Sequence, residues 1–189
     1  MGKKLSEMTL EELWHLFPIR LTQHNEIWTA YYNEMKHILE GALSEYQNVR
    51  ISHIGSTAIN GIWAKPIIDI LVEIEKNDDM DKATVLMQKN GFILMCKEQN
   101  RISLNLGYTE NGFADRVYHL HLRYKGDNDE LYFRDYLNEF PETAKSYERL
   151  KLDLWKRYEF DRDGYTAAKT EFIIRYTKGA KEKYENRYI

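Results

Sequence analysis

Apolar and polar residues alternate with two different periods along this chain, and the change of period divides it into three parts. In residues 1–45 apolar side chains recur every three or four positions, as in amphipathic helices. Residues 46–125 contain short runs rich in β-branched residues, and residues 126–189 return to helical spacing. We therefore expect one domain over residues 1–189, with N-terminal helices, a sheet core and C-terminal helices.

The N-terminal part predicts two helices. Thr9 and Glu12 have the spacing of a capping box, so a short helix is expected up to about Phe17, and Pro18 ends it. A longer helix is expected over residues 22–43. The side chains expected to face the core from this helix are Ile27, Tyr31, Met35, Ile38 and Ala42.

The middle part predicts five strands and one helix. The strands are expected at residues 49–54, 67–74, 92–96, 101–108 and 117–124, and the helix at residues 81–90, where Gly91 is placed to end it. From residue 131 onward the pattern is helical, with Pro141 in a first turn and a turn at 161–164 before a last helix. The fold class expected is α/β (α+β), a mixed β-sheet flanked by helices with a helical C-terminal third.

The composition indicates a globular protein and limits the classes of ligand that it is expected to bind. The chain is 43% apolar, and its formal charge of −3 suits a phosphorylated small molecule better than nucleic acid. Cys96 is the single cysteine, which excludes a disulfide framework and a cysteine zinc site and fits a reducing cytoplasm. Neither a signal peptide nor an apolar run of bilayer length is visible, so we expect no membrane partner and a cytoplasmic location.

Gly55 and Ser56 directly follow the expected strand 49–54. Glycine lets the backbone approach a ligand closely, and the serine offers an amide and a hydroxyl to a phosphate oxygen. The pair therefore predicts a phosphate-binding turn. Taken alone, however, Gly-Ser is a common dipeptide of plain loops.

Asp69 lies within the next expected strand. Ile68, Ile70, Val72 and Ile74 form one apolar face of that strand, and Asp69 points to the other face. A carboxylate in mid-strand needs a partner such as a cation, an arginine or several amides. A bound metal ion would supply one, whereas an exposed aspartate or a local ion pair is the alternative.

Two histidines share one face of the expected strand 117–124. His119 and His121 are two residues apart, which places their side chains about 6–7 Å from each other. Imidazole is a frequent ligand of transition metals, and a carboxylate with two imidazoles is a usual ligand set. The alternative is two polar residues on a solvated sheet face.

In their order and spacing these motifs resemble the GrpB family (UPF0157), whose members look like small nucleotidyltransferase-fold proteins. The resemblance covers about residues 15–178 and is carried by residues 53–58, 65–70, 119–122, 133–137, 141–142, 165–169 and 172–173. It implies that a Gly-Ser pair binds the terminal phosphates of a nucleotide and that an aspartate on a neighbouring strand holds a divalent metal. Gly55, Ser56 and Asp69 occupy those places, and Lys65 is expected to neutralise phosphate.

One departure from the superfamily bears on the chemistry. The superfamily usually carries a second carboxylate two residues after the first, where this chain has Leu71. Glu73 lies about 13 Å from Asp69 along an extended strand, too far for both to bind one ion. His119 and His121 are therefore expected to complete the metal shell or to accept a proton, which would shift the metal from Mg toward Mn or Zn.

Other residues that match the family have two interpretations each. Arg134 and Lys169 could contact phosphate or be structural charges, and for Arg134 an ion pair with Asp135 is the favoured interpretation. Tyr147 and Trp155 are expected to be core residues rather than a platform for base stacking. They belong to the apolar stripe of the C-terminal helices, formed by Ala144, Tyr147, Leu150, Leu154, Trp155 and Tyr158.

Three functions follow as hypotheses. The first is a metal-dependent nucleotidyltransferase that takes a nucleoside triphosphate and an unknown small acceptor, with Asp69, His119 and His121 as catalytic residues. The second is a non-catalytic module that binds nucleotide and metal, motivated by Leu71. The third is RNA modification, which the acidic charge balance disfavours.

Overall fold

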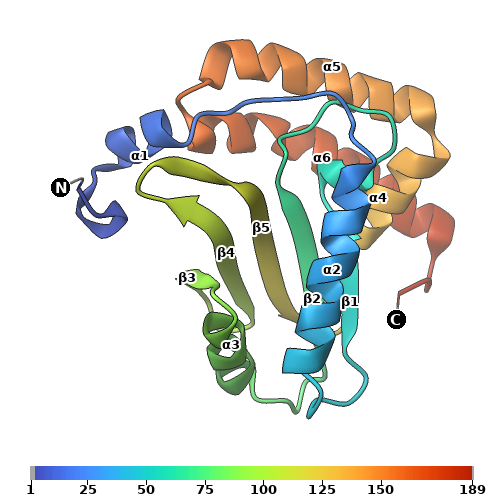
Figure 1. The fold of residues 1–189 in the computed structure, drawn as a ribbon. Helices are drawn as coiled ribbons and strands as arrows, with labels where there is room; N and C mark the ends of the chain where they lie inside the picture. The colour runs from blue at the N-terminus through green and yellow to red at the C-terminus, as the bar shows by residue number, and fades with distance from the viewer. Residues whose placement is uncertain (1–2, 189) are drawn as a thin grey trace.

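The computed structural model describes residues 3–188 and shows a five-stranded sheet with helices on both faces (Figure 1). Two short 3-10 turns, η1 and η2, accompany the main helices. The helical elements are η1 (Leu5–Glu7), α1 (Leu10–Leu16), α2 (Ile27–Ala42), η2 (Ser56–Ala58), α3 (Met80–Lys89), α4 (Asp129–Glu139), α5 (Pro141–Tyr158) and α6 (Arg162–Tyr184). The strands are β1 (Arg50–Ile54), β2 (Ile68–Ile74), β3 (Ile93–Lys97), β4 (Arg101–Thr109) and β5 (Gly112–Tyr124).

The sheet is mixed, with the strand order β1-β2-β5-β4-β3. Strands β2 and β5 pair in parallel, and the other neighbours pair antiparallel. In the parallel pair Asp69 lies directly opposite His119, and Leu71 lies opposite His121. The predicted α/β architecture, a mixed sheet with helices and a helical C-terminal third, is therefore confirmed.

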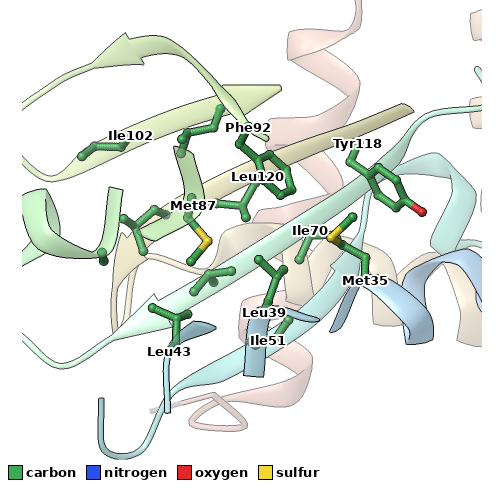
Figure 2. Packing of buried hydrophobic residues seen from close by; sticks show 14 of the residues in the cluster. Met35, Leu39, Leu43, Ile51, Ile70, Met87, Phe92, Ile102, Tyr118 and Leu120 are labelled. Atoms are coloured by element: carbon green, nitrogen blue, oxygen red, sulfur yellow. The ribbon is translucent and has the colours of Figure 1, made fainter. Parts of the chain in front are cut away.

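The main core fills the space between one face of the sheet and the helices α2 and α3. Figure 2 shows Met35 and Leu39 of α2 packed near Ile70 of β2, and Met87 of α3 near Leu120 of β5. Ile68, Ile70, Val72 and Ile74 all belong to this cluster, as the alternation along β2 predicts. The alternate residues of β2 and β5, including Asp69 and both histidines, consequently face α4, α5 and α6.

The boundaries of three predicted elements differ from the prediction. The helix expected over 22–43 begins only at Ile27, because Thr22 exchanges backbone hydrogen bonds with Ala64 and holds an extended conformation. Strand β5 begins at Gly112, since the hairpin with β4 continues to its tip. Helix α6 begins at Arg162 within the expected turn, because the Asp161 side chain accepts from the Gly164 amide and caps the helix.

The buried stripe of α2 also differs from the prediction. Ile27 and Ile38 are 42% and 46% exposed, whereas Trp28 and Leu39 are buried. Met35 is buried as expected, and Tyr31 and Ala42 are partly buried against the core, so the prediction is wrong at Ile27 and Ile38, where the next residue is buried instead. No helix within residues 3–188 combines the length and the apolarity that crossing a bilayer requires.

Glu73 is buried on the face of β2 that carries Asp69, and it has a structural partner of its own. Its side chain is fully buried and accepts two hydrogen bonds from Arg50, at 2.5 and 2.6 Å, and a third from Asn128 at 3.0 Å. The ion pair ties β1 to β2 and to the start of α4. Glu73 therefore satisfies its charge without reaching Asp69.

Replacing Glu73 with alanine is expected to lower the free energy of unfolding by about 3 kcal/mol, because the partly exposed Arg50 and the buried Asn128 lose their shared acceptor. Glu34→Ala is the matched control, since Glu34 pairs with Arg116 but its side chain is 56% exposed, and it should leave stability nearly unchanged. Chemical denaturation of both variants measures the difference. Equal losses would contradict the buried ion pair.

Candidate functional site

A cavity of about 800 Å³ lies between the polar face of the sheet and the C-terminal helices. All six residues singled out as site candidates from the sequence line it: Gly55, Ser56, Lys65, Asp69, His119 and His121. Its far wall is formed by residues of α4, α5 and α6. A concave pocket of this size is the ordinary setting for a small-molecule ligand.

The Gly-Ser turn comes into direct contact with Asp69. Gly55 has φ +71° and ψ −172°, a conformation that disfavours side chains, and a Cβ atom at this position would overlap the Asp69 carboxylate. Glycine is thus required here both by the backbone conformation and by the close approach. The contact places the start of η2 next to the carboxylate, and Ser56 lines the same cavity.

A buried hydrogen-bond chain holds the turn in place. Thr57 is 2% exposed and donates its hydroxyl proton to the Ile67 carbonyl oxygen at 3.1 Å. Its oxygen lies 3.0 Å from Nε2 of His53, which must then be the donor. Burial lowers the pKa of His53 to about 4, with Asp69 opposing this shift and Arg134 adding to it, so the ring is neutral at pH 7.

Asp69 accepts its closest hydrogen bond from His119 of the neighbouring strand. Nδ1 of His119 lies 3.2 Å from Oδ1 of Asp69, and its Nε2 lies 2.8 Å from the Tyr108 hydroxyl. Arg162 donates to the same hydroxyl at 3.0 Å. Both ring nitrogens of His119 are therefore engaged. Burial alone would raise the pKa of Asp69, but the hydrogen bond from His119, followed by the interaction with the nearby His121, outweighs it and holds that pKa far below its usual value.

His121 faces the same carboxylate at longer range. Its Nε2 is 3.9 Å from Oδ1 of Asp69, and its Nδ1 lies 3.4 Å from an Arg123 nitrogen, which can only donate. In this arrangement both imidazoles direct N–H groups at Asp69. Within residues 3–188 no group of three or more His, Cys, Asp or Glu side chains is placed to hold a metal ion.

These contacts define what kind of divalent ion the residues would suit. Asp69 is a carboxylate at the wall of a cavity beside a turn that suits phosphate, and magnesium is usually held by one or two carboxylates together with phosphate oxygens. The residues fit an ion bound through Asp69 and a phosphate ligand. They do not form a complete cage made by the protein alone.

Six cationic side chains line the cavity: Lys65, Lys151, Arg162, Lys169, Lys178 and Lys181, of which Lys181 pairs with Asp129. The sequence motifs singled out Lys65 and Lys169 but not the other four. Lys151 carries a signal that could have been used, because it falls within the apolar stripe of α5, four residues after Tyr147, where a charge is unexpected. Arg162 reaches the cavity from the first turn of α6 and carries no such signal.

The remaining candidates separate into structural and cavity residues. Arg134 forms an ion pair with Asp135 at 2.7 Å and donates to the His53 carbonyl oxygen at 2.8 Å, so the ion pair expected for it is present. Tyr147 is buried against Phe133, as expected for a core residue, although one side of it also lines the cavity. Trp155 is partly buried in another apolar cluster.

Comparisons with known proteins agree with the motifs. A family model described as GrpB protein matches residues 18–179. The glutamate-rich protein GrpB of Alkalihalophilus pseudofirmus is 36% identical over 159 residues, which cover 81% of this chain and 90% of the relative. Two other bacterial relatives, at 32% and 34% identity, are longer, and the matched region spans 52% of each.

Solved structures show the same fold. The crystal structure of the conserved protein GrpB from Enterococcus faecalis has a TM-score of 0.75 at 29% identity, covering 87% of this chain and 99% of that one. The Cid1 poly(U) polymerase with bound Mg 3'-dATP has a TM-score of 0.51 at 8% identity, covering 84% of this chain and 51% of that one. The second likeness concerns the nucleotidyltransferase-like fold alone.

Gly55→Ala should destabilise the protein by about 3 kcal/mol, because the added Cβ combines backbone strain with overlap of Asp69. Gly61→Ala is the matched control, since Gly61 has nearly the same φ of +70° but open space around its Cα, and it should cost only about 1 kcal/mol. Chemical denaturation measures both. The same cost for the two variants would mean that the turn is not pressed against Asp69.

Stability should fall between pH 6.5 and pH 4 through His53. The unfolded chain binds a proton at this histidine below its ordinary pKa of 6.5, whereas the folded protein resists protonation until about pH 4. The free energy of unfolding contributed by this residue therefore decreases by about 2–3 kcal/mol as the pH falls through that window. Denaturation curves of the parent and of His53→Gln at pH 7 and pH 4 isolate the effect. The same loss of unfolding free energy in both proteins between these pH values would contradict it.

Proposed function

The chain belongs to the GrpB family, and from this premise we propose that it binds a nucleoside triphosphate in the cavity and transfers a nucleotidyl group to a small acceptor. The single observation that carries the proposal is spatial. The Gly55–Ser56 turn, the Asp69 carboxylate and a set of unpaired cations surround one cavity of about 800 Å³. Such a wall offers amides and positive charge to phosphates and a carboxylate to a metal ion.

The chain's own residues have separable roles in this chemistry. Backbone and hydroxyl groups of Ser56 bind and orient the terminal phosphates, and Lys65 neutralises part of their charge. Asp69 would hold a divalent ion, which supplies charge neutralisation at the phosphate when bound. His119 keeps the carboxylate ionised and oriented by its hydrogen bond.

His121 is the residue best placed to move a proton. Its nitrogen facing Asp69 makes no hydrogen bond within normal distance, whereas both nitrogens of His119 are engaged. In the tautomer that carries the proton on Nδ1, which requires Arg123 to turn away from that nitrogen, Nε2 can accept the hydroxyl proton of an acceptor. We therefore assign proton transfer to His121 and orientation of the carboxylate to His119.

A specific observation favours a second function, binding of nucleotide without turnover. At position 71, where the superfamily usually has a carboxylate, the leucine is fully buried in an apolar cluster with Ile54 and Leu131. A chain with one carboxylate retains the phosphate site and one metal ligand but loses the ligand of a second ion. Such a protein would act as a nucleotide-responsive module.

Release of pyrophosphate from labelled nucleoside triphosphates, with a panel of hydroxylated and phosphorylated acceptors and Mg²⁺ or Mn²⁺, tests the first function. We expect turnover, and Asp69→Asn should reduce kcat/KM by at least about 100-fold because the ion loses its anionic ligand. Asp153→Asn, on the exposed side of α5, is the matched control and should behave like the parent.

Calorimetry separates the two functions. Nucleotide binding that depends on Asp69 but yields no product with any acceptor would favour the regulatory module over the transferase. Absence of nucleotide binding, with or without metal, would contradict both.

A further inference from the structure

Four of the cations that line the cavity lack acidic partners. Among the ion pairs formed by residues 3–188, none includes Lys65, Lys151, Lys169 or Arg162. The carboxylates that line the cavity are Asp69, Asp129, Glu130 and Glu182; Asp69 is approached by two histidines, and Asp129 pairs with Lys181. Lys65, Lys151, Lys169 and Arg162 therefore stand in a partly buried space without a carboxylate partner. Charges are seldom buried in this way unless a ligand compensates them.

The three lysines are held in place by aromatic rings. The ammonium groups of Lys65 and Lys169 lie 5.1 and 4.4 Å from the centre of the Tyr165 ring. That of Lys151 lies 4.9 Å from the centre of the Tyr147 ring and donates to the Trp63 carbonyl oxygen. Cation–π contacts orient each ammonium group but leave its net charge in place. The lysines are thus positioned before any ligand binds.

Strand β2 offers no second carboxylate beside Asp69 to hold another metal ion. An apolar residue, Leu71, occupies the position of the second carboxylate, and Glu73 forms an ion pair with Arg50. A phosphate chain bound against Ser56 would therefore contact at most one metal ion, the one held by Asp69. The rest of its negative charge has to be matched by side chains, and lysines are common ligands for phosphate.

We propose that Lys65, Lys151 and Lys169 form an anion subsite that binds a phosphate chain without a divalent ion and supplies the charge that a second metal would otherwise provide. The ligand class is a compound with two or more linked phosphates, either the tail of the nucleotide itself or a phosphorylated acceptor. The proposal rests on the proposed function for its nucleotide, but binding of the phosphate chain can be measured separately from transfer.

The acid–base behaviour of the cluster agrees with this assignment. Burial, followed by repulsion from Lys169, lowers the pKa of Lys65 and that of Lys151 to about 7. Burial lowers the pKa of Lys169 to about 8. Arg162 adds repulsion at Lys65, while Asp69 and Glu148 provide the opposing attraction. A polyanion among these groups would relieve the repulsion, and electrostatic gain on binding follows from that relief.

Titration calorimetry with inorganic tripolyphosphate, in excess EDTA, tests the subsite. The parent protein should bind, and Lys169→Met should weaken binding at least about tenfold, with partial recovery in Lys169→Arg. Lys156→Met is the matched control, because Lys156 is 76% exposed on the outside of α5, and it should bind like the parent. Lys65→Met provides a second variant, and thermal unfolding establishes that each variant is folded.

Binding that requires Mg²⁺ or Mn²⁺, or equal affinities for Lys169→Met and Lys156→Met, would overturn the proposal. Repeating the titration with the site filled by a non-hydrolysable nucleoside triphosphate analogue distinguishes the two ligand sources. Exclusion of tripolyphosphate assigns the subsite to the nucleotide tail, and continued binding of tripolyphosphate assigns it to the acceptor.

The outcome is also independent of the proposed function. Metal-free binding of tripolyphosphate without any nucleotidyl transfer would support the anion subsite and contradict the proposed transferase activity. Nucleotidyl transfer together with phosphate binding that strictly requires a metal ion would support the transferase activity and contradict the anion subsite.

Discussion

The contact between Gly55 and the Asp69 carboxylate is the constraint on which the site depends. It brings the turn after β1 against the start of β2, and only a residue without a side chain permits that distance. The same carboxylate is held from the other side by His119, its direct neighbour in the parallel strand pair. Turn, carboxylate and imidazole therefore form one rigid group, placed by the sheet rather than by flexible loops.

The C-terminal helices complete the cavity and give it positive charge. Helix α5 contributes Lys151, and α6 contributes Arg162 and Lys169, opposite the sheet wall that carries Asp69. This division explains why the chain is mildly acidic overall and yet contains a cationic cavity. Surface carboxylates set the net charge, while the interior charge is local. A phosphate ligand would bridge the two halves, so the sheet and the helices each supply part of the site.

Much of the fold could be predicted from the sequence, because the spacing of apolar residues and the runs of β-branched residues indicate which side chains are buried. The order of strands and helices, the apolar face of β2 and the common face of His119 and His121 follow from local pattern. Boundaries were less predictable. The start of α2 depends on the long-range pairing of Thr22 with Ala64, and the stripe buried by α2 depends on the angle at which it meets the sheet.

The residues of the candidate site that lie close together in the sequence were predictable. Those contributed by distant helices that pack against the sheet were not. Gly55, Ser56 and Asp69 lie within one strand–turn–strand segment, so their motif was visible. Lys151 and Arg162 lie more than eighty residues beyond Asp69 in the sequence, and the Tyr108 link between His119 and Arg162 depends on tertiary packing. Such contacts leave no local signature. The buried ion pair of Glu73 is of the same kind.

The most direct measurement is a crystal structure of the protein with a non-hydrolysable nucleoside triphosphate analogue and Mn²⁺, with anomalous scattering locating the metal. The account predicts phosphates against Ser56, one manganese ion on Asp69 and lysine ammonium groups around the phosphate chain. An analogue bound outside the cavity, or phosphates that avoid both Ser56 and the lysines, would contradict it.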